Sequence, residues 1–342
     1  MSSSRQSIPK GVWCTRAGVV ESVHRVNAVV ATDSGRILAR HGDVDWLTVY
    51  RSAAKPFQAI PLVVDGVVDR FGMTREELAL TAASHNGEAE HLSGVAGILE
   101  KLGLSADALK LGPIPPLRRE AAEALYRSGS APTPAHNNCS GQHAAMLGLA
   151  LVHEWPLDTY LDPRHPLQER MLEEMARYTG LPRERIETMP DGCGMVAFGV
   201  PLRNMARSFA MLGTASLKEE GPARVLEAMA AHPFMVGGTD RFCTALIQAT
   251  GGRLIGKLGA EGVYGITVTG EGLGITIKVQ DGGIRAGDAA AVRVLDLMGI
   301  LSPEEGTALE GFRRTIVRNT LGDAVGEISA NFQLESGEGG VA

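Results

Sequence analysis

The sequence is poor in cysteine and in aromatic residues, and it lacks any long apolar run. Of its 342 residues, 4 are cysteines and 5% are aromatic. A membrane-spanning helix needs about 20 consecutive apolar residues, and a secretory signal peptide needs an apolar core of about 7–15 residues. We find neither pattern, and residues 1–13 are largely polar. We therefore expect a cytoplasmic protein with reduced cysteines and no membrane partner.

Positive charge is also scarce. Asp and Glu number 39 against 33 for Lys and Arg, which gives a net charge of −6 and a pI near 5.9. No basic stripe is present, so nucleic acid is disfavoured as a partner. A hydrophobic content of 44% is typical of a globular protein with a large core. The expected substrate is a small molecule.

Periodic patterns predict strands at both ends of the chain and helices between them. Residues 19–32, a turn at 33–35 and residues 37–39 predict a hairpin. Helical spacing or apolar content predicts helices in the middle, over 57–69, 89–102, 144–151, 166–179, 201–213, 221–231 and 240–250. Three strands, over 253–258, 262–269 and 272–279, precede a helix over 286–299. We expect an α+β fold in which both chain ends build one antiparallel sheet, with helices packed on it and the strand that carries Lys257 at its edge.

No repeat or low-complexity linker divides the chain. The expected organisation is an N-terminal tail over 1–17, one catalytic unit over 18–335, and a flexible, Gly-rich C-terminal tail over 336–342. The helical middle, about 70–235, is a candidate subdomain within that unit.

Three short motifs occur in the order typical of serine hydrolases that attack amides without a histidine triad. They are a Ser-x-x-Lys pair, a Ser-x-Asn element and a late Lys-x-Gly element, namely Ser52/Lys55, Ser84/Asn86 and Lys257/Gly259. Each motif alone is weak. A second Ser-x-x-Lys at residues 7–10 contains a proline and precedes no apolar segment, so we interpret it as accidental. The hypothesis depends on the order and context of the motifs.

The chemistry explains the spacing of the first motif. A lysine three residues after a serine on a helix lies on the same face, so a neutral Lys55 can accept the proton of Ser52. Burial and a second positive charge from Lys257 would lower the pKa of that lysine. Pro56 is tolerated in a first helical turn, which places Ser52 near a helix N-terminus. The alternative, a solvated lysine near a capping serine, fits the apolar surroundings less well.

Two glycine-containing loops each carry one cysteine and are candidates for pocket walls. Cys139 is followed by His143, and Cys193 is preceded by Asp191. Two thiolates and an imidazole would suit zinc. The alternative is that the cysteines pack as small apolar groups, and the lack of a Cys-x-x-Cys pair favours it. Asp191 either positions an ammonium group or caps its own turn.

Taken together, these motifs resemble the Rhizobium-type, thermolabile L-asparaginase II family. The resemblance runs from about residue 18 to 330 and is carried by five segments in order, 51–58, 84–88, 137–141, 191–194 and 257–262. It implies a serine β-lactamase/DD-peptidase-like fold, a homodimer, and hydrolysis of L-asparagine to L-aspartate and ammonia.

The resemblance also implies roles for individual residues. Ser52 with Lys55 and Ser84 with Lys257 would form two Ser-Lys tandems, and we favour Ser52 as the nucleophile. Asp191 would support the site. Cys139 and Cys193 would bind zinc beside it.

The sequence departs from the family's pattern at this zinc site. The family has a lysine three residues after its first cysteine, and this chain has Gln142. An amide oxygen is a weaker zinc ligand than a neutral amine. We therefore predict that zinc binds weakly or not at all, unless His143 or a water replaces the lysine.

The predicted activity is that of an L-asparaginase. Arg51 and Asn86 are expected to bind the polar groups of the amino acid, because arginine binds carboxylates bidentately. Alternatives are a glutaminase or another amino-acid amidase. A non-catalytic amino-acid-binding or redox-sensing protein would leave two lysines among apolar residues unexplained. β-Lactamase or peptidase activity is disfavoured because no signal peptide is expected and Leu258 replaces the usual hydroxyl residue.

Overall fold

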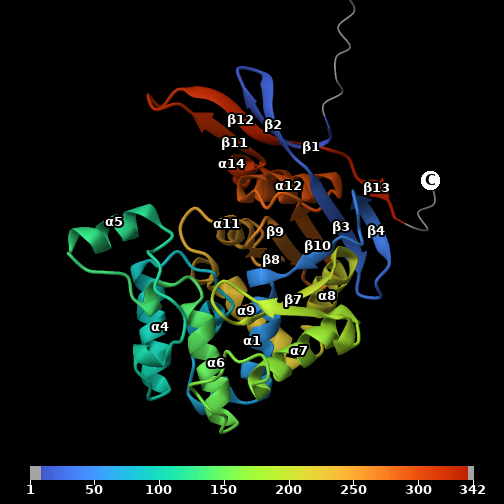
Figure 1. Ribbon diagram of the computed structural model, residues 1–342. Helices are drawn as coiled ribbons and strands as arrows, with labels where there is room; N and C mark the ends of the chain where they lie inside the picture. The colour runs from blue at the N-terminus through green and yellow to red at the C-terminus, as the bar shows by residue number, and fades with distance from the viewer. Residues whose placement is uncertain (1–8, 338–342) are drawn as a thin grey trace, which may run out of the picture.

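The computed structural model describes residues 9–337 as an α+β protein whose largest sheet is built from both ends of the chain (Figure 1). The sheet has six strands in the order β13-β4-β3-β10-β9-β8. Their bounds are Val26–Thr32 for β3, Ile37–His41 for β4, Leu254–Gly259 for β8, Val263–Val268 for β9, Leu273–Val279 for β10 and Glu335–Ser336 for β13. All neighbouring strands are antiparallel, which confirms the predicted fold class.

The two ends of the chain meet where β3 pairs with β10. Val26 lies opposite Val279, and Thr32 lies opposite Leu273. β3 is buried along nearly its whole length because it lies inside the sheet, and its β-branched residues suit that position. β8 forms one edge of the sheet, which confirms the position predicted for the strand that carries Lys257.

Helices cover both faces of this sheet. α8 (Leu202–Ala215) packs on one face, where Gly274 allows a close approach, since a Cβ there would lie 2.0 Å from a carbonyl oxygen of α8. α12 (Ile284–Leu297) packs on the other face, where Gly287 lies against the Tyr264 ring. Figure 1 shows α12 above the sheet and α8 below it.

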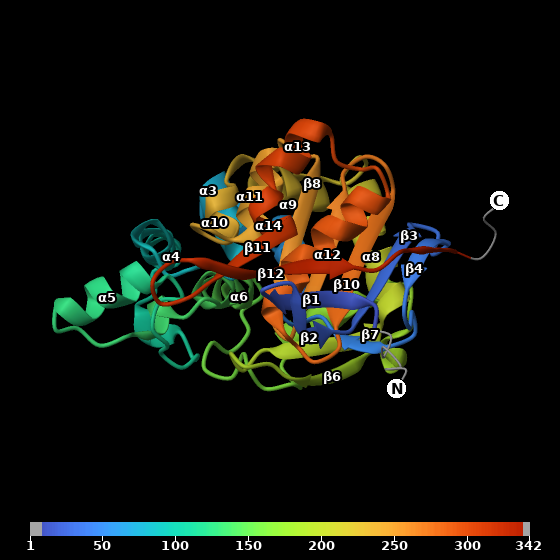
Figure 2. The same cartoon turned by 90° about the horizontal axis from the view of Figure 1, so that it is seen from above.

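The helical middle of the chain packs below the sheet, apart from α5, which projects from the side in both ribbon views (Figures 1 and 2). The remaining helices are α1 (Lys55–Val64), α2 (Val67–Arg70), α3 (Arg75–Thr81), α4 (Ala89–Lys101), α5 (Arg119–Arg127), α6 (Ser140–Val152), α7 (Pro166–Thr179), α9 (Glu220–Ala231), α10 (Pro233–Val236), α11 (Phe242–Ala249), α13 (Pro303–Ala308) and α14 (Glu310–Arg313). Nine of the ten residues of α1 are buried. The single helix predicted over 57–69 is divided into α1 and α2, because Gly66 has a φ of 79° that a continuous helix does not allow.

Two smaller sheets were not predicted. One has the order β11-β12-β1-β2, with bounds Gly11–Arg16 for β1, Val19–His24 for β2, Arg314–Arg318 for β11 and Ala324–Asn331 for β12. The other has the order β5-β7-β6, with bounds Leu47–Val49 for β5, Glu187–Pro190 for β6 and Val196–Pro201 for β7. Residues 11–16, which the sequence placed in an N-terminal tail, therefore form a paired strand. Ser336, which the sequence placed in the flexible C-terminal tail, pairs with Ala39 in the largest sheet. Residues 1–8 and 338–342 of the predicted tails lie outside the described residues.

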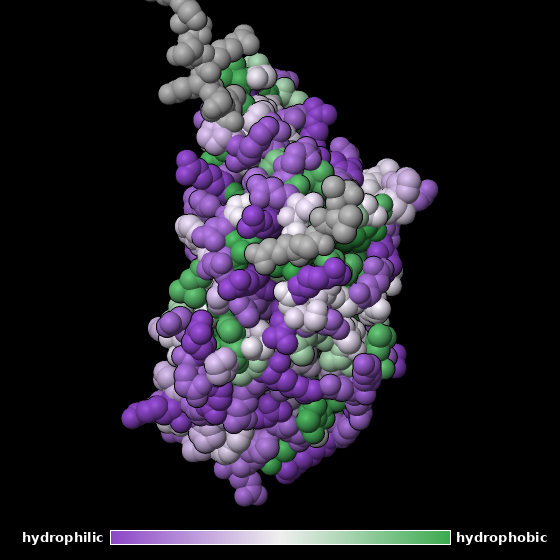
Figure 3. Space-filling view, turned by 90° about the vertical axis from the view of Figure 1, so that its right-hand side faces the viewer, coloured by the Kyte–Doolittle hydropathy of each residue, from purple (hydrophilic) through white to green (hydrophobic). Residues whose placement is uncertain are grey.

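The surface seen in Figure 3 is mainly hydrophilic, with hydrophobic residues in small separate groups. Within residues 9–337, the helices are all too short or too polar to cross a membrane.

Candidate active site

The Ser84 hydroxyl lies between two buried lysines. Nζ of Lys257 lies 2.9 Å from Ser84 Oγ, and Nζ of Lys55 lies 3.3 Å from the same oxygen. The lysines are only 1% and 2% exposed, and Ser84 is 4% exposed. The structure thus brings together three residues that the motifs singled out from distant parts of the chain.

Backbone hydrogen bonds fix the loop that carries Ser84. This loop follows α3, and its successive N–H groups donate to Val236 O, Asn138 O and Gly237 O at 3.2, 3.1 and 3.0 Å. The 3₁₀ helix η1 (Arg51–Ala54) packs against β8 on the other side of the site. Gly259 permits this contact, because a Cβ there would lie 2.3 Å from Tyr50 O. The close contact therefore explains why the Lys-x-Gly motif has a glycine at this position, where a side chain would not fit.

Ser52 lies in η1, directly before α1, as the proline pattern predicted. It is half-buried. In the described structure no hydrogen bond joins it to Lys55, whose ammonium donates to Ala83 O at 2.6 Å, to Cys139 Sγ at 3.1 Å and to Ser84. Lys55 turns toward these acceptors because they are buried and need a donor. The helical spacing alone did not predict this geometry.

The two lysines stand in different electrostatic surroundings. Burial, together with the positive charge of Lys55, lowers the pKa of Lys257 to about 7. An amine with such a pKa is about half neutral near pH 7, so Lys257 can accept a proton there.

The two cysteines lie next to each other beside Lys55. The hydrogen bond from Cys193 and the charge of Lys55 outweigh burial and lower the pKa of Cys139 to about 5. The same hydrogen bond and burial raise the pKa of Cys193. Of the two cysteines, Cys139 is therefore the one whose charged form is favoured, and its sulfur lies 3.1 Å from Lys55 Nζ.

The other candidate zinc ligands each make a hydrogen bond within the protein, although Nε2 of His143 is buried without a partner in the described structure. Gln142 Nε2 donates to Gln58 Oε1 at 2.6 Å, and His143 Nδ1 lies 2.7 Å from the Tyr160 hydroxyl. No group of three or more His, Cys, Asp or Glu side chains that could hold a metal ion occurs within residues 9–337. A structural zinc site needs four ligands, so two adjacent thiols do not fit one. Weak or absent zinc binding stays a prediction.

Arg51 and Asp191 form an ion pair at the rim of the site. Arg51 Nε donates to Asp191 Oδ1 at 2.6 Å. The backbone of Arg51 has a φ of 49°, a left-handed conformation that non-glycine residues adopt rarely and that often marks functional sites. Asp191 thus holds an arginine of the protein next to Ser52.

The Asn86 amide is also fully engaged by the protein. Its Nδ2 donates to Glu88 Oε1 at 3.0 Å and to Thr239 O at 2.8 Å, while its Oδ1 accepts a hydrogen bond from Arg241 Nη1 at 3.1 Å. Asn86 therefore orients Arg241.

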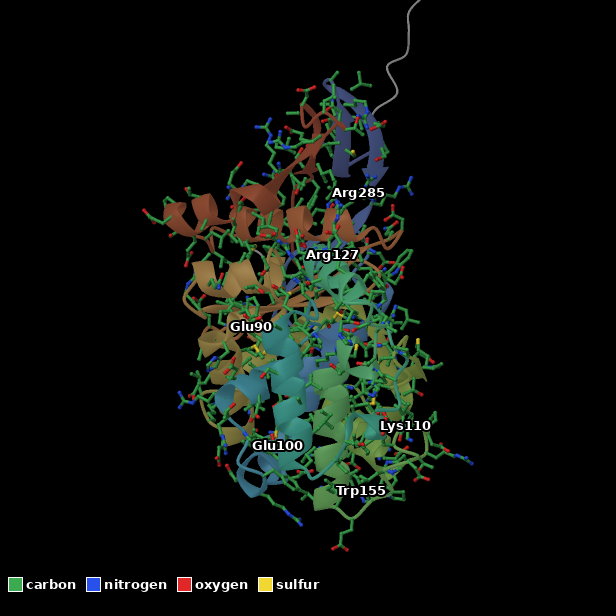
Figure 4. The ribbon with its side chains drawn as sticks, turned by 90° about the vertical axis from the view of Figure 1, so that its left-hand side faces the viewer. Glu90, Glu100, Lys110, Arg127, Trp155 and Arg285 are labelled. Carbon is green, nitrogen blue, oxygen red and sulfur yellow. The ribbon has the colours of Figure 1, made fainter. Side chains whose placement is uncertain are left out.

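A cavity of about 380 Å³ opens beside both serines. Its wall includes Ser52, Ser84, Asn138, Arg241, Tyr264 and Asp288. Leu117, before α5, and Ile284, at the start of α12, also line it and are exposed. Figure 4 views the molecule from the side of α5 and labels Arg285, the neighbour of Ile284.

Sequence reasoning missed Arg241, Tyr264 and Asp288. One signal was available for Asp288, an acidic residue in the first half of a helix otherwise rich in alanine and valine. Arg241 lies directly before α11 and carries no local pattern.

A pocket that presents serine hydroxyls beside buried amines is the kind of site that hydrolases use for nucleophilic attack. Comparison with protein families agrees with this class. The family model of L-asparaginase II matches residues 12–330, and the chain belongs to the L-asparaginase II family. Membership indicates an amidohydrolase and confirms the resemblance read from the motifs.

Other comparisons add little. No curated protein matches the chain. Among solved structures, Mglu in its native form in 4.3 M NaCl matches with a TM-score of 0.43 and 16% identity, over 81% of this chain and 61% of Mglu. A β-lactamase from Mycobacterium bovis matches with a TM-score of 0.41 and 15% identity, over 79% of this chain and 94% of that one. The chain thus spans about three fifths of the length of Mglu. TM-scores this low do not support a functional relationship with either protein.

Proposed function

We propose that the protein is an L-asparaginase that hydrolyses L-asparagine to L-aspartate and ammonia through a serine nucleophile. The observation that carries the proposal is the convergence of Lys55 and Lys257 on Ser84 at the wall of a small pocket. It supports amide hydrolysis because a serine is a poor nucleophile and needs an amine that is neutral at working pH. The homodimer and the cytoplasmic location stay predictions.

Ser52 is the nucleophile in this proposal. It is half-buried and lines the pocket, so a substrate can reach it. Ser84 is nearly inaccessible, and its oxygen already faces two lysine Nζ atoms. A buried hydroxyl that accepts a hydrogen bond from Lys55 and can pass its own proton to a neutral Lys257 is better suited to relay protons than to attack a carbonyl carbon, and it keeps one lone pair for the proton of Ser52. Ser84 therefore relays protons.

Lys257 is the base. With a pKa of about 7 it is partly neutral, and its lone pair can accept the Ser84 proton while Ser84 accepts the proton of Ser52. Lys55 donates to three acceptors and stabilises the negative charge that develops at the site.

The catalytic cycle then balances its protons. Ser52 Oγ attacks the side-chain amide carbon, and backbone N–H groups near Ser52 stabilise the oxyanion. Lys257 returns the proton through Ser84 to the leaving nitrogen, the C–N bond breaks, and ammonia departs. Water attacks the acyl-enzyme by the same relay, which releases L-aspartate and restores Ser52.

The test is ammonia release from L-asparagine and L-glutamine, with a chromogenic β-lactam as a control substrate. We expect turnover of L-asparagine, and a loss of about 10³-fold or more in kcat for Ser52→Ala. The control Ser93→Ala removes an exposed hydroxyl on α4 and should retain full activity. Preference for L-glutamine or hydrolysis of the β-lactam would contradict the proposed activity.

A rapid acid quench followed by peptide mapping locates the acyl group. An aspartyl ester on Ser52 is expected. An ester on Ser84 instead would exchange the roles of the two serines. Normal turnover by both Ser52→Ala and Lys55→Met would refute the mechanism.

A further inference from the structure

Arg241 brings an uncompensated positive charge into the pocket. It is half-buried, and its one side-chain hydrogen bond goes to the neutral amide of Asn86 at 3.1 Å. Within residues 9–337 no carboxylate forms an ion pair with it, and its sequence neighbour Asp240 pairs with Arg118. Because a partly buried guanidinium without a counter-charge is costly, a negatively charged ligand is the natural partner.

Asp288 brings the opposite charge into the same pocket. It lies in α12, and its Oδ1 is buried without a hydrogen-bond partner in the described structure. Burial raises the pKa of Asp288 to about 6, although a hydrogen bond from Tyr264 and the charge of Arg241 oppose that rise. An unpartnered buried carboxylate oxygen is stabilised if a ligand supplies a donor.

Arg241 and Asp288 carry opposite charges at one cavity. Arg241 and Asp288 come from different elements, both line the cavity, and they do not form an ion pair with each other. A free L-amino acid carries a carboxylate and an ammonium on one carbon atom. We propose that Arg241 binds the α-carboxylate and Asp288 binds the α-ammonium of the substrate, an assignment that rests on the proposed function.

This assignment explains two other features of the site. Arg51, which the sequence suggested as the carboxylate ligand, is already paired with Asp191, so Arg241 takes that role. Asn86 acts as a positioning residue because it holds Arg241. With Ser52 at the side-chain amide, the protein contacts the substrate at three points. These contacts select one enantiomer of a free amino acid over a peptide-bound residue.

The test uses substrates that lack one charge. Succinamate is L-asparagine without the α-amino group, and β-alaninamide is L-asparagine without the α-carboxylate. Asp288→Asn should lower kcat/KM for L-asparagine about 10²-fold and leave succinamate unchanged. Arg241→Gln should lower kcat/KM for both L-asparagine and succinamate by a similar factor and leave kcat/KM for β-alaninamide unchanged. Asp107→Asn, at an exposed aspartate far from the pocket lining, is the control and should change nothing.

The ratio between two substrates measured on one preparation does not depend on the fraction of folded enzyme, so a poorly folding variant still gives an answer. Asp288→Glu should partly restore the ratio of kcat/KM for L-asparagine to kcat/KM for succinamate. If Asp288→Asn and Arg241→Gln each lower kcat/KM equally for all three substrates, Arg241 and Asp288 have a structural role and the assignment is wrong.

Calorimetry separates this result from a failure of the proposed function. L-Asparagine should bind to Ser52→Ala and bind at least tenfold more weakly when Asp288→Asn is added. If the wild type hydrolyses no amide but this binding difference is found, the proposed function fails and the amino-acid site stands. Turnover of L-asparagine with equal binding to both variants would overturn the Asp288 assignment alone.

Discussion

Replacing Lys257 by methionine is expected to stabilise the protein while it abolishes activity. Lys257 is 1% exposed, and burial with the charge of Lys55 lowers its pKa from 10.5 to about 7. Lowering the pKa of this lysine from 10.5 in the unfolded chain to about 7 in the folded protein corresponds to a penalty of about 5 kcal/mol. Methionine fills nearly the same volume without charge, so the substitution removes this penalty.

The hydrogen bonds lost in Lys257→Met offset part of this gain in stability. Lys257 Nζ lies 2.9 Å from both Ser84 Oγ and Leu258 O. Each hydrogen bond contributes about 1 kcal/mol net, so the expected stabilisation is about 3 kcal/mol where the penalty is complete.

The sign of the pH dependence follows from the lowered pKa. The unfolded chain holds the Lys257 proton up to pH 10.5, whereas the folded protein releases it near pH 7. The penalty is therefore complete below pH 7, decreases between pH 7 and 10.5, and is absent above that range. The advantage of Lys257→Met should be largest at pH 6 and smallest at pH 10.

Urea unfolding at pH 6, 8 and 10 measures this difference in the free energy of unfolding. Lys218→Met removes an exposed lysine and serves as the control, with little change at any pH. If Lys257→Met is less stable than the wild type at pH 6, or if its advantage does not change with pH, Lys257 is not a buried amine of lowered pKa and the reasoning is refuted.

Three further predictions follow from the same geometry. First, kcat/KM for L-asparagine should rise as pH increases through about 7, because only neutral Lys257 is a base; in Lys55→Met, ¹³C NMR of labelled lysines should show a higher Lys257 pKa, and an unchanged value would contradict the coupling. Second, metal analysis of the purified enzyme should find zinc well below one equivalent, and a chelator should leave activity intact; tightly held stoichiometric zinc would contradict this. Third, Gly259→Ala should lower stability by about 1–3 kcal/mol and reduce activity, because its Cβ would lie 2.3 Å from Tyr50 O; Gly112→Ala, which meets nothing within 4 Å, is the matched control, and equal effects would argue against the steric explanation.

Local patterns predicted the parts of the fold that local residues determine. The hairpin β3–β4 has a short turn over residues 33–36, and the β8–β10 meander has Gly-containing turns, so local residue patterns reveal both. β1 pairs with β2 across a two-residue turn, but it was missed because its mixed sequence GVWCTR has no clear alternation. Its other partner, β12, lies more than 300 residues away. Pairing over such a separation leaves no local signal.

The site shows the same division. Motif spacing identified Lys55, Ser84 and Lys257, because the chemistry constrains residue types along the chain. It could not show that Lys55 faces Ser84 more closely than Ser52, since that depends on where the α3 loop is anchored by residues 138 and 236–237. Asp288 was missed because its role depends on Arg241 across the cavity and not on its neighbours in sequence.

The Cys139 thiol explains how two buried lysines can play different roles at one serine. The hydrogen bond from Cys193 and the charge of Lys55 lower the pKa of Cys139 and favour its thiolate, and its sulfur lies 3.1 Å from Lys55 Nζ. Lys257 has only neutral acceptors in hydrogen-bond contact, Ser84 and a backbone carbonyl, and it faces the Lys55 charge, so Lys257 is the amine that gives up its proton. A metal on Cys139 would take the thiolate away from Lys55. In the proposed mechanism, Gln142, where the resemblance implies a lysine ligand, therefore has a second effect: without a metal, Cys139 stays paired with Lys55, and Lys257 serves as the base.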